Sequence, residues 1–140
     1  MRKLIAVLLL VVTSSLYAAD QKSKETKTKD KRFEAVTVEA AGITGSYRGP
    51  AESYGLVLEI ASDGTLRGNY VEMGRVAVLN TILLNGAKFS AKASFDDGSS
   101  RIINGSFARR VLNGATAFGL RMHDVPVEGF GMIDTFFERF

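Results

Sequence analysis

The chain of 140 residues contains no cysteine and no tryptophan, one histidine and two prolines. Without cysteine it can form no disulfide, so the folded state must be stabilised by its hydrophobic core alone. Cysteine-based metal sites and a lipid anchor on a cysteine are excluded as well. Because His123 is the single histidine, a site with several histidine ligands is also excluded, and we expect neither a metal nor another cofactor.

Long apolar runs are scarce too. The longest, residues 4–12, has nine residues, which is too short to span a bilayer. It follows Arg2 and Lys3 and precedes the small residues Ala18 and Ala19, an order typical of a secretory signal peptide. We therefore expect residues 1–19 to be a cleaved signal peptide and the mature protein to be periplasmic or secreted.

Residues 20–35 are expected to form a basic, disordered linker. Residues 20–32 contain six basic and three acidic side chains and no apolar one, so burial cannot offset their ordering entropy. A solvated spacer is favoured over a basic tether for an anionic surface. Residues 33–140 hold ten basic and twelve acidic side chains, a net charge of −2, which gives no electrostatic footprint for nucleic acid.

From residue 36 to residue 140 apolar and polar side chains alternate, and turn glycines interrupt the pattern. This predicts one all-β domain, an antiparallel up-and-down β-barrel of about eight strands. The interior of such a barrel can be filled by side chains or can hold one small ligand. The expected strands are 42–48, 54–61, 65–73, 76–84, 87–95, 99–111, 115–123 and 129–139.

Two hairpin turns fit three-residue loops that end in a left-handed glycine, one at Gly64 and one at Gly98. Residues directly opposite each other in a hairpin share one face, and this loop length places Leu56 opposite Tyr70. The same geometry at Gly98 places Arg101 on the inner face, close to the end of its strand.

The turns at Gly86 and Gly114, each preceded by asparagine, fit two-residue loops instead. The first register places Asn80 on the inner face of the barrel. The second places Arg109 opposite Phe118, on the inner face as well.

Asn80, Arg101 and Arg109 are thus expected to face an apolar interior, where an arginine has to be paired or stacked. The favoured interpretation is that Arg109 closes one barrel end, stacked on Phe118 or Tyr47 and bonded to carbonyl oxygens. The alternative is that Arg101 or Arg109 binds the carboxylate of a ligand.

Three segments carry a resemblance to a known family: residues 43–47 with the order Ile-Thr-Gly-Ser-Tyr, residues 61–70 with an Asp-Gly turn, and residues 134–136. They resemble the avidin and streptavidin family and, more broadly, lipocalin-like barrels. The resemblance implies an eight-stranded barrel with a ligand pocket at one mouth. Tryptophans enclose the ligand in that family, and this chain has none, so the resemblance does not imply biotin as the ligand. The polar ligand contacts that the resemblance implies are Ser53, Tyr70 and Asp134, which lie at matching motif positions.

These features predict a binding module for a small, partly apolar ligand. The alternative is a protein-interaction or inhibitor barrel whose interior is fully packed. The expected ligand-binding residues are Tyr47, Ser53, Tyr70, Asn80, Arg101, Arg109 and Asp134.

Other classes of function are disfavoured. The sequence has no nucleophile elbow and no phosphate-binding loop, and His123 beside Asp124 fits an exposed pair, so we expect no enzyme. The expected outward side chains of residues 87–95 are two lysines and two serines, which cannot face hydrocarbon, so we expect no membrane span.

Overall fold

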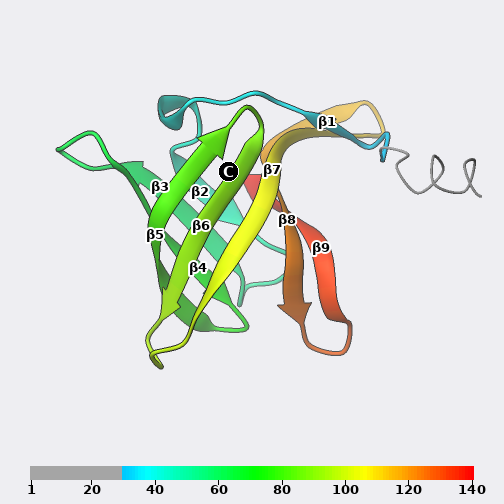
Figure 1. Cartoon of the computed structure of the whole chain (residues 1–140). Helices are drawn as coiled ribbons and strands as arrows, with labels where there is room; N and C mark the ends of the chain where they lie inside the picture. Colours follow the sequence, from blue (N-terminus) through cyan, green and yellow to red (C-terminus); the bar gives the residue numbers. More distant parts are fainter. Residues whose placement is uncertain (1–29) are drawn as a thin grey trace, which may run out of the picture. The chain divides into compact units, whose positions relative to one another are not determined.

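The computed structural model describes residues 30–140, so the expected signal peptide and residues 20–29 of the expected linker lie outside the described residues. Nine strands form one antiparallel sheet, and eight of them, β2 to β9, close into an up-and-down barrel (Figure 1). The expected all-β barrel is confirmed. The elements are β1 (Phe33–Ala35), the short 3-10 helix η1 (Ala40–Gly42), β2 (Gly45–Arg48), β3 (Gly55–Ile60), β4 (Leu66–Glu72), β5 (Arg75–Asn85), β6 (Lys88–Phe95), β7 (Ser100–Leu112), β8 (Ala115–Val127) and β9 (Gly131–Arg139).

Each of the strands β2 to β9 pairs with its neighbours in the chain, and the barrel closes between β2 and β9. The closing ladder is short: Tyr47 pairs with Arg139, and Arg48 pairs with Glu138. In the described part of the chain we find no apolar helix of bilayer-spanning length.

The two three-residue loops are confirmed. Gly64 has φ +83° and Gly98 has φ +85°, the left-handed conformation that glycine adopts without strain. Leu56 lies opposite Tyr70, and Ala93 lies opposite Arg101, as expected.

The predicted register at Gly86 is wrong. Asn85 pairs with Lys88, so the loop consists of Gly86 and Ala87, one position later than expected. The ladder between β5 and β6 then shifts between Asn80 and Leu83, a β-bulge in which Thr81 has φ +53°.

The bulge decides which residues of β5 enter the barrel. Ala77 and Leu79 are buried before it, and Ile82 and Leu84 pack against the core after it. Asn80 is exposed and donates to the Ser94 hydroxyl at 3.2 Å, so its expected inward position is wrong. The reason is physical: a buried amide without a partner is costly, and the bulge leaves Asn80 in water.

The expected linker also needs correction at its end. Residues 33–35 form β1, which pairs with Ala108–Arg110 of β7. Figure 1 shows β1 beside the end of β7. At that point β6 has already turned, and β1 covers the edge of β7 that β6 leaves open. Ordered structure therefore begins before residue 36.

The core is the inner face of the barrel, and its largest side chains are aromatic. Phe107 contacts Tyr47 and Phe89, with ring centroids 6.3 and 5.8 Å apart, and stacks on Phe118 at 5.8 Å. Such offset and edge-on contacts are favourable beyond the area they bury. These rings form a continuous aromatic cluster in the core of the barrel.

Candidate functional site

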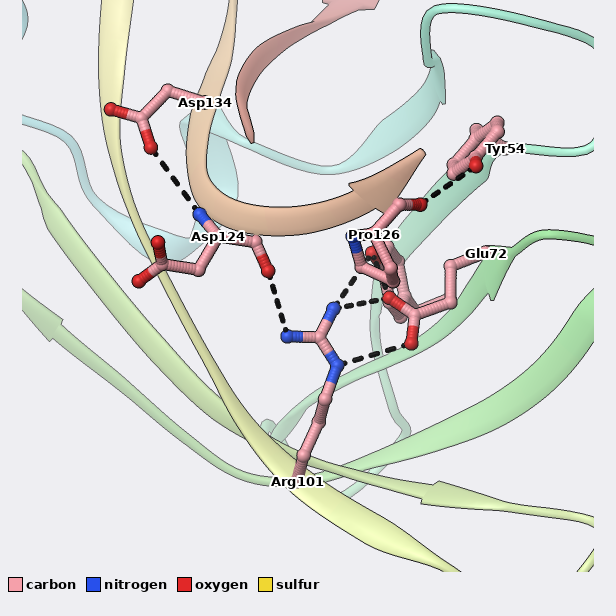
Figure 2. Close-up of polar contacts among 7 residues, drawn as sticks. Tyr54, Glu72, Arg101, Asp124, Pro126 and Asp134 are labelled. Carbon is pink, nitrogen blue, oxygen red and sulfur yellow. Dashed lines mark hydrogen bonds and ion pairs between the residues drawn. The ribbon is translucent and has the colours of Figure 1, made fainter. Parts of the chain in front are cut away.

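The buried charged side chain of the described region is Glu72, which is 2% exposed. It follows Tyr70 by two residues on β4, and because side chains alternate along a strand, both point into the barrel. Arg101 reaches it from β7, three strands away in the sheet. Its Nε donates to Oε1 of Glu72 at 3.0 Å, and its Nη2 donates to Oε2, so the ion pair is bidentate (Figure 2).

Tyr70 completes this cluster. Its hydroxyl donates to Oε2 of Glu72 at 2.8 Å and accepts a longer bond from Nη2 of Arg101 at 3.4 Å. Burial and the negative charge of Glu72 raise the pKa of Tyr70 above its ordinary value, so the hydroxyl stays protonated. Burial lowers the pKa of Arg101, but the hydrogen bond and charge of Glu72 outweigh burial and raise it. The cluster therefore holds one carboxylate, one guanidinium and one neutral phenol.

The cluster also holds β8 across the barrel. The ladder of β7 with β8 ends at Met122, and β8 then bulges at Asp124, which has φ +53°. Nη1 of Arg101 donates to the carbonyl oxygen of Asp124 at 3.2 Å (Figure 2). Tyr54 donates its hydroxyl to the carbonyl oxygen of Pro126 at 2.7 Å. Between these two contacts Val125 is fully buried, so this part of β8 closes against the core.

The guanidinium of Arg101 makes its hydrogen bonds within the protein. Glu72 takes the edge that carries Nε and Nη2, and Nη1 donates to the Asp124 carbonyl oxygen. Every buried side-chain nitrogen and oxygen of the described residues has a hydrogen-bond partner. The cluster is therefore a closed internal network that satisfies its own charges.

Tyr47 and Tyr70 point inward as expected, but their hydroxyls are used within the protein. The Tyr47 hydroxyl donates to the carbonyl oxygen of Ile43 at 2.6 Å. Burial raises the pKa of Tyr47 to about 12, against a smaller opposing effect of Arg139.

The expected inward position of Arg109 is wrong, although its pairing with Phe118 is confirmed. Its side chain is 47% exposed and lies 3.8 Å from the carboxylate of Glu34. The hairpin of β7 and β8 continues beyond the end of β6, so the face that carries Phe107 inside the barrel is open to solvent at Arg109. Arg139, not Arg109, stacks on Phe118, with its guanidinium 4.5 Å from the ring centroid.

Ser53 and Asp134 lie outside the interior. Ser53 is exposed in the turn before β3, and its carbonyl oxygen accepts from the Gly74 backbone at 3.0 Å. Asp134 is exposed on β9 and pairs with Nδ1 of His123 at 3.1 Å. Partial burial raises the pKa of Asp134, but bonds from His123 and the Asp124 backbone outweigh it and lower the pKa. Of the seven expected residues, the structure joins Tyr70 and Arg101.

Sequence reasoning missed the role of Glu72. The signal was present, because Gly68, Tyr70 and Glu72 follow one another at period two and must share a face. The partner of His123 was also misplaced. His123 pairs with Asp134 across the β8–β9 hairpin, and not with its neighbour Asp124.

Hollows lined by described residues open to solvent on the barrel. One of about 500 Å³ lies at the loop after β2, beside Arg48 and Phe140. One of about 400 Å³ lies over β4 and β5 at Val78 and Asn80. One of about 300 Å³ lies over β5 to β8 and includes His123 in its lining.

Comparison with known proteins identifies no relative: no protein-family model, no curated protein and no solved structure matches this chain.

Proposed function

We propose that this protein is an exported, non-catalytic binding protein that engages a partner protein through the outside of its barrel, while the interior serves as the core. The single observation that carries this proposal is the internal use of the inner polar groups. Tyr47, Tyr70, Glu72 and Arg101 bond to one another or to backbone oxygens instead of facing an empty pocket. This supports the packed-interior alternative over a ligand inside the barrel.

The outer wall offers an apolar surface for such a partner. Val57, Val76 and Val78 are 41%, 43% and 52% exposed, and Val71 lies opposite Val76. Val57 and Val78 both flank Asn69 in the sheet, so these four valines form one face over β3 to β5. We call it the valine face. Contiguous exposed apolar residues on a soluble domain favour contact with a partner.

Catalysis is not part of the proposal. His123 and Asp134 have the arrangement of a base and its orienting carboxylate, but in the described part of the chain no hydrogen bond joins His123 to a serine. A nucleophile within hydrogen-bond reach of the base is the geometric requirement for acyl transfer.

Site-specific photo-crosslinking in the cell of origin tests the proposal. A crosslinking residue placed at Val78 should give one discrete protein adduct, and the same residue at Thr116, an exposed position at the tip of the β7–β8 hairpin, should give none. Native mass spectrometry of the purified protein should show the mass of the polypeptide alone. A retained small molecule that the Tyr70→Phe variant no longer holds would place the ligand inside the barrel and contradict the proposal.

A further inference from the structure

The hollow over β5 to β8 has features that the proposed protein contact does not use. It measures about 300 Å³, at the lower end of small-molecule sites. Under it, β7 and β8 approach closely at Gly105, where an added Cβ would lie 2.6 Å from the Arg121 carbonyl oxygen. Leu83, a residue of the lining, lies two positions after Thr81, where β5 bulges. The full lining is Leu83, Asn85, Lys88, Phe89, Ser90, Asn104, Gly105, Ser106 and His123.

Most of the surface that the hollow exposes is apolar, and its polar residues include hydrogen-bond donors but no carboxylate. Lys88 contributes an ammonium group, Asn85 and Asn104 contribute amides, and the two serines contribute hydroxyls. Leu83, which is 61% exposed, supplies apolar surface beside them. A cation surrounded by neutral donors and an apolar wall is complementary to an anion that carries a short apolar part.

The imidazole of His123 is fixed in this lining by its carboxylate neighbour. Nδ1 lies 3.1 Å from Oδ2 of Asp134, and Oδ1 of Asp134 accepts from the backbone of Asp124 at 3.3 Å. Because Asp134 engages Nδ1, the other ring nitrogen, Nε2, is the one available to a ligand. Asp134 itself is not part of the lining, so it orients the ring without placing a negative charge in the hollow.

We propose that this hollow binds a small organic carboxylate with a short apolar chain. The carboxylate accepts hydrogen bonds from the Lys88 ammonium and from Nε2–H of His123, which is a donor in the imidazolium form because Nδ1–H already faces Asp134. The chain lies on Leu83. The site stands apart from the valine face and does not depend on the proposed protein partner.

Titration of the purified protein with hexanoate, followed by backbone amide NMR shifts, tests this site. We expect saturable shifts in residues 83–90, 104–106 and 123, with at least tenfold weaker binding of hexanol, which lacks the charge, and of acetate, which lacks the chain. Lys88→Gln and His123→Gln should each weaken hexanoate binding at least fivefold. Leu83→Ser should weaken hexanoate but leave acetate unchanged.

Lys92→Gln is the matched control, because Lys92 lies on the same strand and face as Lys88 but outside the lining. It should leave the affinity for hexanoate unchanged. The proposal is overturned if hexanoate gives no saturable shifts at these residues, if hexanol binds equally well, or if Lys92→Gln weakens binding as much as Lys88→Gln does.

Discussion

At the scale of single residues, the pair of Glu72 and Arg101 combines charge with burial. The Glu72 side chain is 3% exposed and that of Arg101 is 26% exposed. Removing one partner of such a pair leaves a charge in an environment that solvates it poorly, whereas replacing both partners by apolar residues is often tolerated. The pair therefore acts as a unit, and its net contribution to the free energy of unfolding can be measured only when both residues are changed.

We expect Arg101→Leu to lower the free energy of unfolding by about 3 kcal/mol, because the Glu72 carboxylate loses its counter-charge. The double variant Glu72→Leu with Arg101→Leu should recover more than half of that loss. Urea midpoints measure both. Arg67→Leu is the control, since the Arg67 side chain is 62% exposed beside Asp63 and should cost under about 0.5 kcal/mol. Equal costs for Arg101→Leu and Arg67→Leu would contradict the buried ion pair.

Because of Tyr47, the free energy of unfolding depends on pH in the alkaline range. Its pKa is raised in the folded state from its ordinary value of 10.0 to about 12, chiefly by burial. Between these values the unfolded chain releases a proton that the folded chain keeps, so stability falls as pH rises from 10 to 12. The full loss from this residue is about 3 kcal/mol. We expect Tyr47→Phe to lose less stability than the parent between pH 9 and 11. Parallel curves for the two proteins would contradict this.

Individual residues were predictable where one turn fixes the register unambiguously. Arg101 lies three residues beyond Gly98, and the left-handed glycine fixes the register, so Arg101 can lie only on the inner face of the sheet. The orientation of Asn80 was not predictable, because a bulge between it and the nearest turn moves its side chain to the other face of the sheet. Arg109 was placed on the correct face, but the hairpin leaves the barrel before that residue, and alternation carries no information on where a barrel ends.

At the scale of elements, the turns carry most of the information about this fold. Gly64 has φ +83°, and an added Cβ would have no neighbour within 4 Å, so any cost of a side chain there comes from backbone conformation alone. We expect Gly64→Ala to lower the free energy of unfolding by about 1 kcal/mol and Gly64→Asn by less, since asparagine tolerates the left-handed region.

Gly42 provides the control for that experiment. It also has open space around its Cβ position, but it has no left-handed φ. Gly42→Ala should therefore leave the denaturation midpoint nearly unchanged. A neutral Gly64→Ala would mean that the loop between β3 and β4 does not need a left-handed residue.

The elements that sequence reasoning missed lack a strong local signal. In β5 both possible faces are apolar, with Val76 and Val78 on one and Ala77 and Leu79 on the other, so hydrophobicity alone does not select the register. β1 has three residues, none of them buried, which is too short for alternation to be visible. Its position depends on the unpaired edge of β7, which is a property of the assembled sheet.

At the scale of the whole molecule, the number of strands and their even spacing predicted closure, because an open meander of this length would expose two edges. What the interior contains was not predictable at this scale. Alternation places Tyr70, Glu72 and Arg101 on inner faces but does not show that these side chains bond to one another across the barrel. Such contacts connect strands that are distant in the sequence.

Contacts at β1 hold the start of the folded unit in place. The backbone of Val111 donates to the carbonyl oxygen of Arg32 at 2.9 Å. Phe33 contacts the ring of Phe136 at 5.4 Å and lies under the guanidinium of Arg121 at 4.6 Å. Gly119 makes these contacts possible, because a Cβ there would lie 2.7 Å from the ring of Phe136. β1 is thus fixed by backbone pairing and by an aromatic contact on the outer wall.

We expect a chain that begins at residue 36 to be less stable than one that begins at residue 30 by about 2 kcal/mol, because it loses the ladder to β7 and the Phe33 ring. Phe33→Ala in the longer chain should account for about half of this difference, and Glu34→Ala, whose side chain is 69% exposed, for under about 0.5 kcal/mol. Urea denaturation of the four proteins measures these differences. If the chains that begin at residues 30 and 36 unfold at the same midpoint, β1 contributes nothing to the domain, and the boundary expected from composition alone, at residue 36, is the correct one.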